Sequence, residues 1–112
     1  MARMSDKNAT EDEASEIRRL ASDPTLVRTT TTVEFDLMGH SLTKSDACDE
    51  IIQWIDSGER VKATTLHSVS GLIGERAFEM KPRMNDRLFY IKVTFQQSEG
   101  QVLLILSCHP NH

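Results

Sequence analysis

Long apolar runs are missing from this 112-residue sequence. No segment approaches the roughly 20 consecutive apolar residues that a helix needs to cross a bilayer. The first residues, Met1-Ala-Arg-Met-Ser-Asp-Lys7, also lack the apolar block of a secretory signal peptide. We therefore expect a cytoplasmic protein that does not insert into a membrane.

Cysteine is scarce, and its spacing does not match known zinc motifs. The two cysteines, Cys48 and Cys108, form neither a CxxC pair nor a Cys/His zinc spacing. Two thiols in a cytoplasmic chain are usually free, so we expect no disulfide. His109 and His112 have no further ligands at a recognisable spacing, and the sequence therefore predicts neither a metal site nor a cofactor.

The chain is also short. With 38% hydrophobic and 27% charged residues, it can form one small domain around a single modest core. This leaves no room for a separate regulatory domain. We assign residues 1–9 to a polar N-terminal tail and residues 10–112 to one folded domain.

Positive charge is concentrated in one segment of an acidic protein. The whole chain carries a net charge of −4, and residues 1–59 sum to −7. Residues 60–92 sum to +4, because seven Lys and Arg residues stand there against three Asp and Glu residues. Such a segment indicates a nucleic-acid surface on one side of the protein, although it also fits a solvated sheet face.

Periodicity and capping residues predict two helices in the first half of the chain. Thr10-Glu-Asp-Glu13 has the form of a capping box, and the helix that it opens ends at Asp23-Pro24. A second helix begins after Ser41 or Thr43 and stops at Gly58. The apolar stripes of the two helices are Ile17, Leu20 and Ala21 in the first, and Ala47, Ile51, Ile52, Trp54 and Ile55 in the second.

The remaining ordered segments are predicted to be strands. Val27–Leu37 is rich in β-branched residues and is expected to be a strand, although a connector into the next helix also fits. Four further strands form an antiparallel meander over residues 60–67, 75–81, 87–96 and 101–108. The sequence thus predicts an α+β fold in which a small antiparallel β-sheet packs against two or three helices.

Alternation along the last two strands separates the faces of this sheet. Between Leu88 and Phe95, one face receives Tyr90, Lys92 and Thr94, and the other receives Phe89, Ile91, Val93 and Phe95. Val102–Leu106 is continuously apolar, which predicts a central strand buried on both faces. We expect the functional residues on the polar face.

Six short segments spread over most of the chain after residue 16 carry a resemblance to a known family. They are Ile17-Arg-Arg-Leu20, Leu26-Val-Arg-Thr-Thr30, Val61-Lys-Ala-Thr-Thr65, Lys81-Pro-Arg83, Phe89-Tyr-Ile-Lys-Val93 and Leu103 to Ser107. Their order and spacing, including the eight-residue step from Pro82 to Tyr90, resemble those of the motility quorum-sensing regulator (MqsR) toxins. This family belongs to the RelE/ParE-like mRNA interferases.

The resemblance implies a RelE-like fold and a toxin of a type II toxin–antitoxin system, an endoribonuclease that cleaves mRNA until its antitoxin binds. Lys62 matches a catalytic lysine, Tyr90 a catalytic tyrosine and Lys81 a basic residue of the same site. His109 falls where the family has a C-terminal lysine. The family's catalytic glutamine falls at Ala77, and this chain is acidic where such toxins tend to be basic, so the likeness is incomplete.

Metal-independent RNA cleavage needs a base for the 2′-hydroxyl, an acid for the leaving 5′-oxygen and fixed positive charge at the phosphate. Glu75 or Glu79 shares strand parity with Ala77 and could act as the base. His109 could act as the acid, since histidine exchanges protons near neutral pH. Other branches of the RelE-like superfamily look similar in pairing a glutamate with a C-terminal histidine.

The remaining basic residues are candidates for holding the RNA. Tyr90 could orient the phosphate or stack on a base, while Lys81 and Arg83 could join Lys62 in stabilising negative charge. Further RNA-binding candidates, predicted from their place in the basic segment or beside its loop, are Arg76, Lys92 and His67. Glu75 and Glu79 could instead pair only with neighbouring cations across the sheet.

Two other function classes fit the same sequence. One is a non-catalytic protein-binding or inhibitor relative of the same fold, whose acidic first half would suit a basic partner. The other is a ParE-like gyrase toxin, which would not need a catalytic His/Tyr/Lys set. For the ribonuclease, the implied partners are an mRNA substrate and a cognate antitoxin, and the sequence leaves open a homodimer or a toxin–antitoxin hetero-oligomer.

Overall fold

The computed structural model describes residues 7–69 and 71–111. Over these residues the chain forms the predicted α+β fold, with three α-helices and a mixed six-stranded sheet. In chain order the elements are α1 (Glu11–Ala21), the 3-10 helix η1 (Pro24–Leu26), β1 (Val27–Thr29), α2 (Thr31–Gly39), α3 (Lys44–Asp56), β2 (Lys62–Thr65), β3 (Arg76–Met80), β4 (Arg83–Met84), β5 (Arg87–Gln97) and β6 (Gln101–Pro110).

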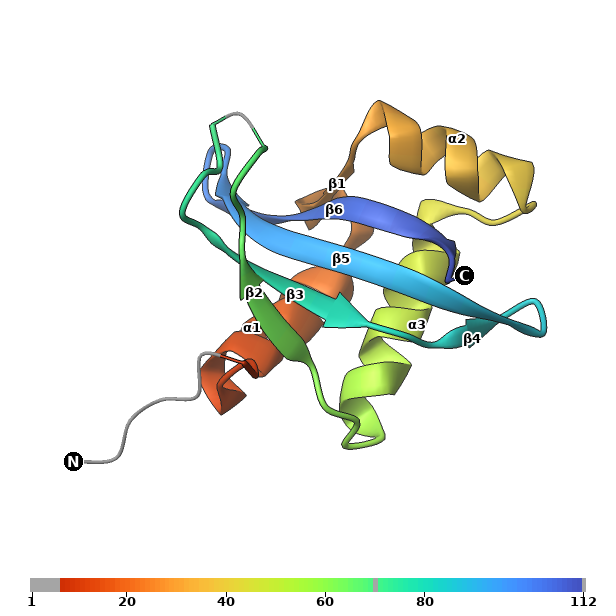
Figure 1. The fold of residues 1–112 in the computed structure, drawn as a ribbon, viewed down its shortest axis with the longest axis horizontal. Helices are drawn as coiled ribbons and strands as arrows, with labels where there is room; N and C mark the ends of the chain where they lie inside the picture. Colours follow the sequence, from red (N-terminus) through yellow and green to blue (C-terminus); the bar gives the residue numbers. More distant parts are fainter. Residues whose placement is uncertain (1–6, 70, 112) are drawn as a thin grey trace.

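The sheet has the strand order β1-β6-β5-β3-β2, and the short β4 pairs with the beginning of β5. The predicted antiparallel meander of β2, β3, β5 and β6 is confirmed, while β1 adds a parallel strand and makes the sheet mixed. Figure 1 shows α1 and α3 crossing one face of the sheet and α2 lying beside β6. The opposite face of β2, β3 and β5 is not covered by a helix.

Helix α1 begins as predicted. The Thr10 side chain accepts a hydrogen bond from the Glu13 backbone N–H, and the Glu13 carboxylate accepts one from the Thr10 backbone N–H. This reciprocal pair is the expected capping box, and it satisfies two of the backbone donors left free at a helix start. The buried face of α1 consists of Ile17, Leu20 and Ala21.

The predicted strand Val27–Leu37 is wrong beyond its third residue. Strand β1 ends at Thr29, and Thr30 then caps helix α2 by accepting a hydrogen bond from the Val33 backbone N–H. The threonines are β-branched and favour strands, but the hydroxyl of Thr30 favours a helix start even more. Val33 and Leu37, four residues apart, then face the core from α2.

Helix α3 is confirmed, and Thr43 rather than Ser41 caps it. Thr43 and Asp46 form a second capping box, and the helix ends before Gly58, whose φ of 78° lies in the left-handed region. Its buried residues, Ala47, Cys48 and Ile51, contribute to the core together with Phe78, Phe89, Ile91, Val93, Leu103 and Ile105 of the sheet. Both cysteines of the chain are free and buried, as expected.

Residues 7–9 belong to the fold rather than to a tail. The Ala63 N–H donates to the carbonyl of Lys7 at 2.8 Å, and the Ala9 N–H donates to the carbonyl of Val61 at 2.9 Å. Asn8 and Lys62 thus form an antiparallel bridge along the outer edge of β2. The rest of the predicted tail, residues 1–6, lies outside the described residues.

Strand β6 differs from its prediction in two ways. It continues past Cys108 to Pro110, because β5 is long enough to pair with this last stretch. It is not buried on both faces throughout: Leu104 and Leu106 are half-buried, since β6 is apolar on both sides but only one side is covered by α1 and α3. Among the described helices, none has the length and apolar character needed to span a membrane.

Candidate functional site

The open face of the sheet contains a row of charged and polar residues across four strands. The register pairs Glu79 of β3 with Lys62 of β2 on one side and with Lys92 of β5 on the other. Lys92 in turn pairs with Ser107 of β6. Directly paired residues point to the same face of a sheet, so this carboxylate lies between two lysines.

Tyr90 and His109 form the next pair along the same face. They are register partners on β5 and β6, and their ring centroids lie 5.6 Å apart. The Tyr90 hydroxyl donates a 2.8 Å hydrogen bond to Oε2 of Glu79. The bond is diagonal, because Tyr90 is two residues before the direct partner of Glu79, and a tyrosine is long enough to span that distance. It links the lysine row to His109.

The environment of Tyr90 keeps its phenol protonated. Partial burial raises its pKa first, and the hydrogen bond to Glu79 and the negative charge of that carboxylate raise the pKa further. A phenol held in this way donates a hydrogen bond and does not act as a base near neutral pH. Tyr90 therefore acts as a hydrogen-bond donor that orients the Glu79 carboxylate.

The place of His109 depends on the extension of β6. The register shifts between Lys92 and Val93, where β6 contains an extra residue, and this shift sets Tyr90 opposite His109. His109 Nδ1 lies 2.9 Å from the carbonyl oxygen of Pro110, so when Nδ1 is protonated it donates to that oxygen. The imidazole is half-buried.

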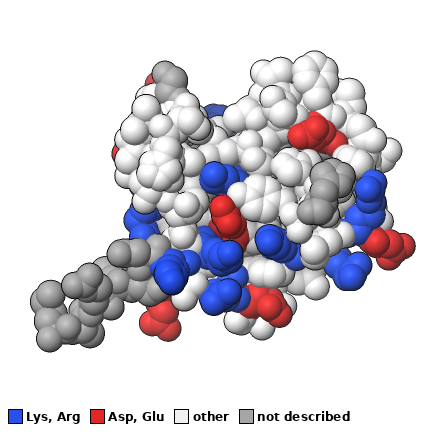
Figure 2. Space-filling view, in the orientation of Figure 1, with Lys and Arg blue, Asp and Glu red and all other residues white. Residues whose placement is uncertain are grey.

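Positive charge dominates this face near the row. Figure 2 shows basic side chains gathered where β2, β3 and the first half of β5 lie in Figure 1, with acidic atoms among them. The ion pairs formed within residues 7–69 and 71–111 are Arg18–Asp56, Arg19–Glu16 and Arg76–Glu13. Lys62 and Lys92 take part in none of these, so both ammonium groups can attract a phosphate.

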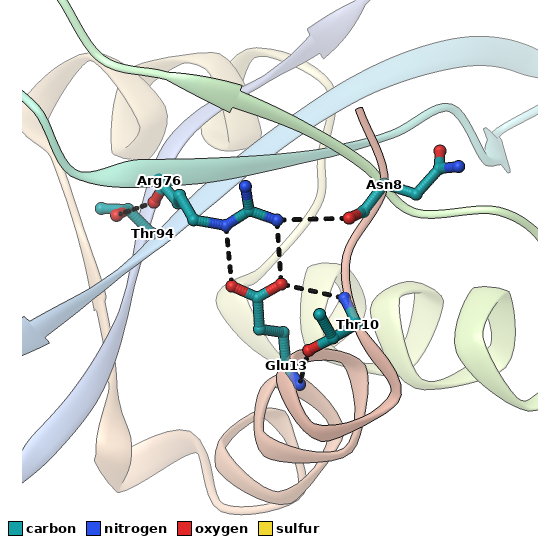
Figure 3. A network of polar contacts seen from close by, with 5 residues as sticks. All are labelled: Asn8, Thr10, Glu13, Arg76 and Thr94. Carbon is teal, nitrogen blue, oxygen red and sulfur yellow. Dashed lines mark hydrogen bonds and ion pairs between the residues drawn. The ribbon is translucent and has the colours of Figure 1, made fainter. Parts of the chain in front are cut away.

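Arg76 lies on the other face of the sheet, so the structure does not bring it together with the other RNA-binding candidates. Its register partner is Thr65, three positions along from the Lys62–Glu79 pair, and this odd number places the Arg76 side chain on the opposite face, toward α1. There it forms a two-bond ion pair with Glu13, at 2.8 and 3.0 Å, and donates to the carbonyl of Asn8 at 3.2 Å (Figure 3). Arg76 fastens the start of α1 and the N-terminal segment to β3.

Two other candidates lie apart from the row. Glu75 is exposed and precedes β3, four positions before Glu79, which is about 13 Å along an extended strand. His67 is exposed in the loop after β2. The structure therefore brings Glu79, not Glu75, together with Tyr90 and the lysines.

Ala77, the position at which the resemblance places a catalytic glutamine, is not part of the accessible site. It is fully buried, opposite the buried Thr94, whose hydroxyl donates to the Arg76 carbonyl oxygen at 2.7 Å. Leu66 and Val102 are buried on this face as well, outside the main core cluster. At this end the open face is packed, and the accessible part begins at Glu79.

A pocket of about 320 Å³ extends the site past the edge of the sheet. It is lined by Trp54, Glu59, Arg60, Lys62, Glu79, Met80 and Lys81. A second pocket of about 360 Å³ shares Trp54, Glu59 and Lys81 and continues to Arg83. The sequence assigned Trp54 to the core alone. It packs against the core and also lines both pockets. The sequence feature that could have indicated this second role is a single tryptophan close to the basic segment.

The arrangement offers a carboxylate, an imidazole and several cations on one surface. Within the described ranges, no group of three His, Cys, Asp or Glu residues is placed to hold a metal ion. Comparisons of this chain with protein-family models, with curated proteins and with solved structures give no match. The resemblance to the MqsR toxins therefore stays a prediction from the sequence.

Proposed function

We propose that this protein is a metal-independent endoribonuclease that cleaves mRNA and acts as the toxin of a type II toxin–antitoxin system. The observation that supports the catalytic part is the Glu79–Tyr90–His109 arrangement beside Lys62 and Lys92. It places a proton acceptor, a proton donor and positive charge on one accessible face, which are the groups that phosphodiester cleavage by a 2′-hydroxyl requires. The toxin role comes from the resemblance alone.

In the proposed reaction, Glu79 removes the proton of the 2′-hydroxyl, and the 2′-oxygen attacks the adjacent phosphorus. The P–O5′ bond breaks, and His109 gives its proton to the leaving 5′-oxygen. The products are a 2′,3′-cyclic phosphate and a 5′-hydroxyl, so the atoms and protons balance without water entering this step. Lys62 and Lys92 offset the charge that builds on the non-bridging oxygens, while Tyr90 keeps the carboxylate in place.

The test is cleavage of a structured mRNA in the presence of EDTA, with mapping of the new ends. The wild type is expected to give discrete cuts with 2′,3′-cyclic phosphates, and Glu79→Gln is expected to cut about 10²–10⁴-fold more slowly. Glu75→Gln is the matched control and should keep full activity, because it removes the same charge outside the row. Cleavage by Glu79→Gln at the wild-type rate, or no cleavage by folded wild-type protein, would remove the proposal.

A second candidate is the non-catalytic protein-binding function, and one observation favours it. Phe35 and Met38 of α2 are 67% and 72% exposed, and Met38 lines a pocket of about 500 Å³ together with Thr29, Glu34, Leu37, Leu42 and Lys44. Exposed apolar side chains close together are typical of protein-interaction surfaces. Because α2 is separate from the Glu79 row, Phe35→Ser/Met38→Ser should leave RNA cleavage unchanged and weaken only binding to a protein partner.

A further inference from the structure

The α3–β2 loop and the end of β3 enclose a binding space next to Glu79. Figure 1 shows this loop below the end of β3. The two pockets there share Trp54, Glu59 and Lys81, and together they run from Glu79 to Arg83. The smaller one, at about 320 Å³, falls at the lower end of the range for small-ligand sites, which suits one nucleoside.

Trp54 gives this space a flat apolar wall. Its indole N–H donates a 3.1 Å hydrogen bond to the carbonyl oxygen of Arg60, which fixes the ring relative to the loop. The ring is also half-buried and packs against the core. An indole fixed at the rim of a basic pocket is well suited to stacking on a base, and stacking of this kind accepts every nucleobase.

The charges around Trp54 suit the backbone of a single RNA strand. Lys62 and Lys81 line the pocket beside Glu79, Arg60 lies on its loop side, and Arg83 continues the basic line into the second pocket. The Glu59 carboxylate lines both pockets and can accept hydrogen bonds from the donor groups of a base. A larger pocket, about 800 Å³, is lined by Glu11, Asp12, Asp56 and Glu59 against Arg18 and Arg60, and is therefore less suited to phosphates.

The order of the strands sets the direction of the RNA. The pocket lies on the β2–β3 side of Glu79, whereas His109 lies on β6, across β5. If Glu79 takes the proton of the 2′-hydroxyl and His109 protonates the 5′-oxygen, the strand runs 5′ to 3′ from β3 toward β6. The nucleotide that carries the attacking 2′-hydroxyl is then the one nearest to Trp54.

We propose that Trp54, Lys62 and Lys81 form a nucleobase-binding site for single-stranded RNA that holds the base on the 5′ side of the cleaved bond. The direction of the strand rests on the proposed function, whereas the binding of RNA to the pocket does not. Stacking on Trp54 would accept any base on the 5′ side of the cut, Glu59 would favour bases that present donor groups, and the base after the cut would lie toward β6.

Binding can be measured without catalysis, because Trp54 is the single tryptophan of the chain. Its fluorescence is titrated with short 2′-O-methyl RNA oligonucleotides, which lack the attacking hydroxyl, and a labelled oligonucleotide measures binding independently. We expect saturable quenching, with affinity about tenfold or more weaker in Lys62→Ala/Lys81→Ala. Arg19→Ala/Arg28→Ala loses the same charge from α1 and β1 and should bind like the wild type. Absence of quenching by an oligonucleotide that binds, or absence of binding, would overturn the site.

The cut positions test the direction. Glu59→Gln keeps the size of the side chain but replaces one carboxylate acceptor with an amide donor, so it should change the base preference on the 5′ side of the cut, while the preference on the 3′ side stays as in the wild type. An unchanged 5′ preference, or a change on the 3′ side alone, would contradict the assignment. Quenching without any RNA cleavage would support the RNA-binding site and reject the ribonuclease. Cleavage without quenching would support the ribonuclease and reject the RNA-binding site.

Discussion

The hydroxyl of Tyr90 donates a 2.8 Å hydrogen bond to the carboxylate of Glu79, from β5 to β3. The two residues are not direct register partners, so the bond braces the carboxylate diagonally across the sheet. On its other side Tyr90 lies beside His109, with 5.6 Å between ring centroids. Tyr90 thus connects the two groups to which we assign proton transfer.

The first prediction concerns the ionisation of Tyr90, the single tyrosine of the chain. Its pKa is raised by burial and then by the hydrogen bond and charge of Glu79, so tyrosinate should not appear in the folded protein at the pH where free tyrosine ionises. A spectrophotometric titration of native and urea-unfolded protein measures this. Because the pKa of Tyr90 is higher in the folded than in the unfolded protein, its environment contributes to the free energy of unfolding. The contribution is fully present below the unfolded-state pKa of about 10, and it is lost as the pH rises through the folded-state pKa.

Glu79→Gln isolates the contribution of the carboxylate to that titration. The variant removes the negative charge and the strong acceptor but keeps Tyr90 partly buried, so the pKa of Tyr90 should fall toward, without reaching, the value of free tyrosine. Glu75→Gln should leave the curve unchanged. Identical curves for wild type and Glu79→Gln would show that the Tyr90–Glu79 bond does not form in solution.

The second prediction separates the structural role of Arg76 from an RNA-binding role. Arg76→Met breaks the ion pair with Glu13. Burial acts to raise the pKa of Glu13, but the bonds to Arg76 and to Thr10 together outweigh burial and lower the pKa. Urea unfolding at neutral pH should show a loss of about 1–2 kcal/mol, moderated by the partial exposure of both side chains. Since the folded-state pKa of Glu13 is depressed, this difference should shrink as the pH falls through it.

Lys92→Met is the matched control for Arg76→Met. It removes one positive charge from the open face and keeps the apolar stem, so its stability should stay within about 0.5 kcal/mol of the wild type. Its affinity for RNA should fall, whereas that of Arg76→Met should not. The opposite pattern would return Arg76 to the RNA surface.

The third prediction concerns the two thiols. Burial raises the pKa of Cys48 to about 11 and that of Cys108 to about 12, with the negative charge of Asp36 adding to the effect at Cys108. Buried, protonated thiols are poor nucleophiles. Both should react with Ellman's reagent at mildly alkaline pH only after unfolding, and rapid reaction of the native protein would show that the core around α3 or β6 opens readily.

The fourth prediction concerns Ala77, the position at which the resemblance would place a catalytic glutamine. Ala77→Gln should destabilise the protein by about 2–4 kcal/mol, because it overfills a closely packed position and buries an amide. It should not raise the rate of RNA cleavage. A stable variant with faster cleavage would mean that position 77 is accessible from the site and that Glu79 is not the base.

Much of the fold follows from local signals in the sequence. The capping box at Thr10 and the alternation from Phe89 to Phe95 each act over a few residues, and both were predicted correctly. Helix α2 was missed because two local preferences oppose each other in this segment. The β-branched threonines favour a strand, whereas the hydroxyl of Thr30 favours a helix start. The helix becomes stable only when Val33 and Leu37 are buried.

The candidate site depends on register, which the sequence specifies only indirectly. Strand parity allowed both Glu75 and Glu79, and only the pairing of β3 with β5 brings Glu79 to Tyr90. The sequence did not reveal the pairing of Arg76 with Glu13, because the two residues are 63 positions apart and charge alone does not identify partners. Trp54 was treated as core, and it is also the wall of a pocket that forms only when the α3–β2 loop meets the end of β3.

The most direct test of the proposed chemistry compares two substrates under single-turnover conditions, with EDTA present. One is an RNA oligonucleotide containing a single cut site, and the other has sulfur in place of the bridging 5′-oxygen there, so that its leaving group departs without a proton. We predict that His109→Ala cleaves the oxygen substrate about 10²–10⁴-fold more slowly than the wild type and the sulfur substrate at nearly the wild-type rate, whereas Glu79→Gln is slow on both. Equal slowing of His109→Ala on both substrates, or full activity of either variant on the oxygen substrate, would contradict the assignment of acid and base.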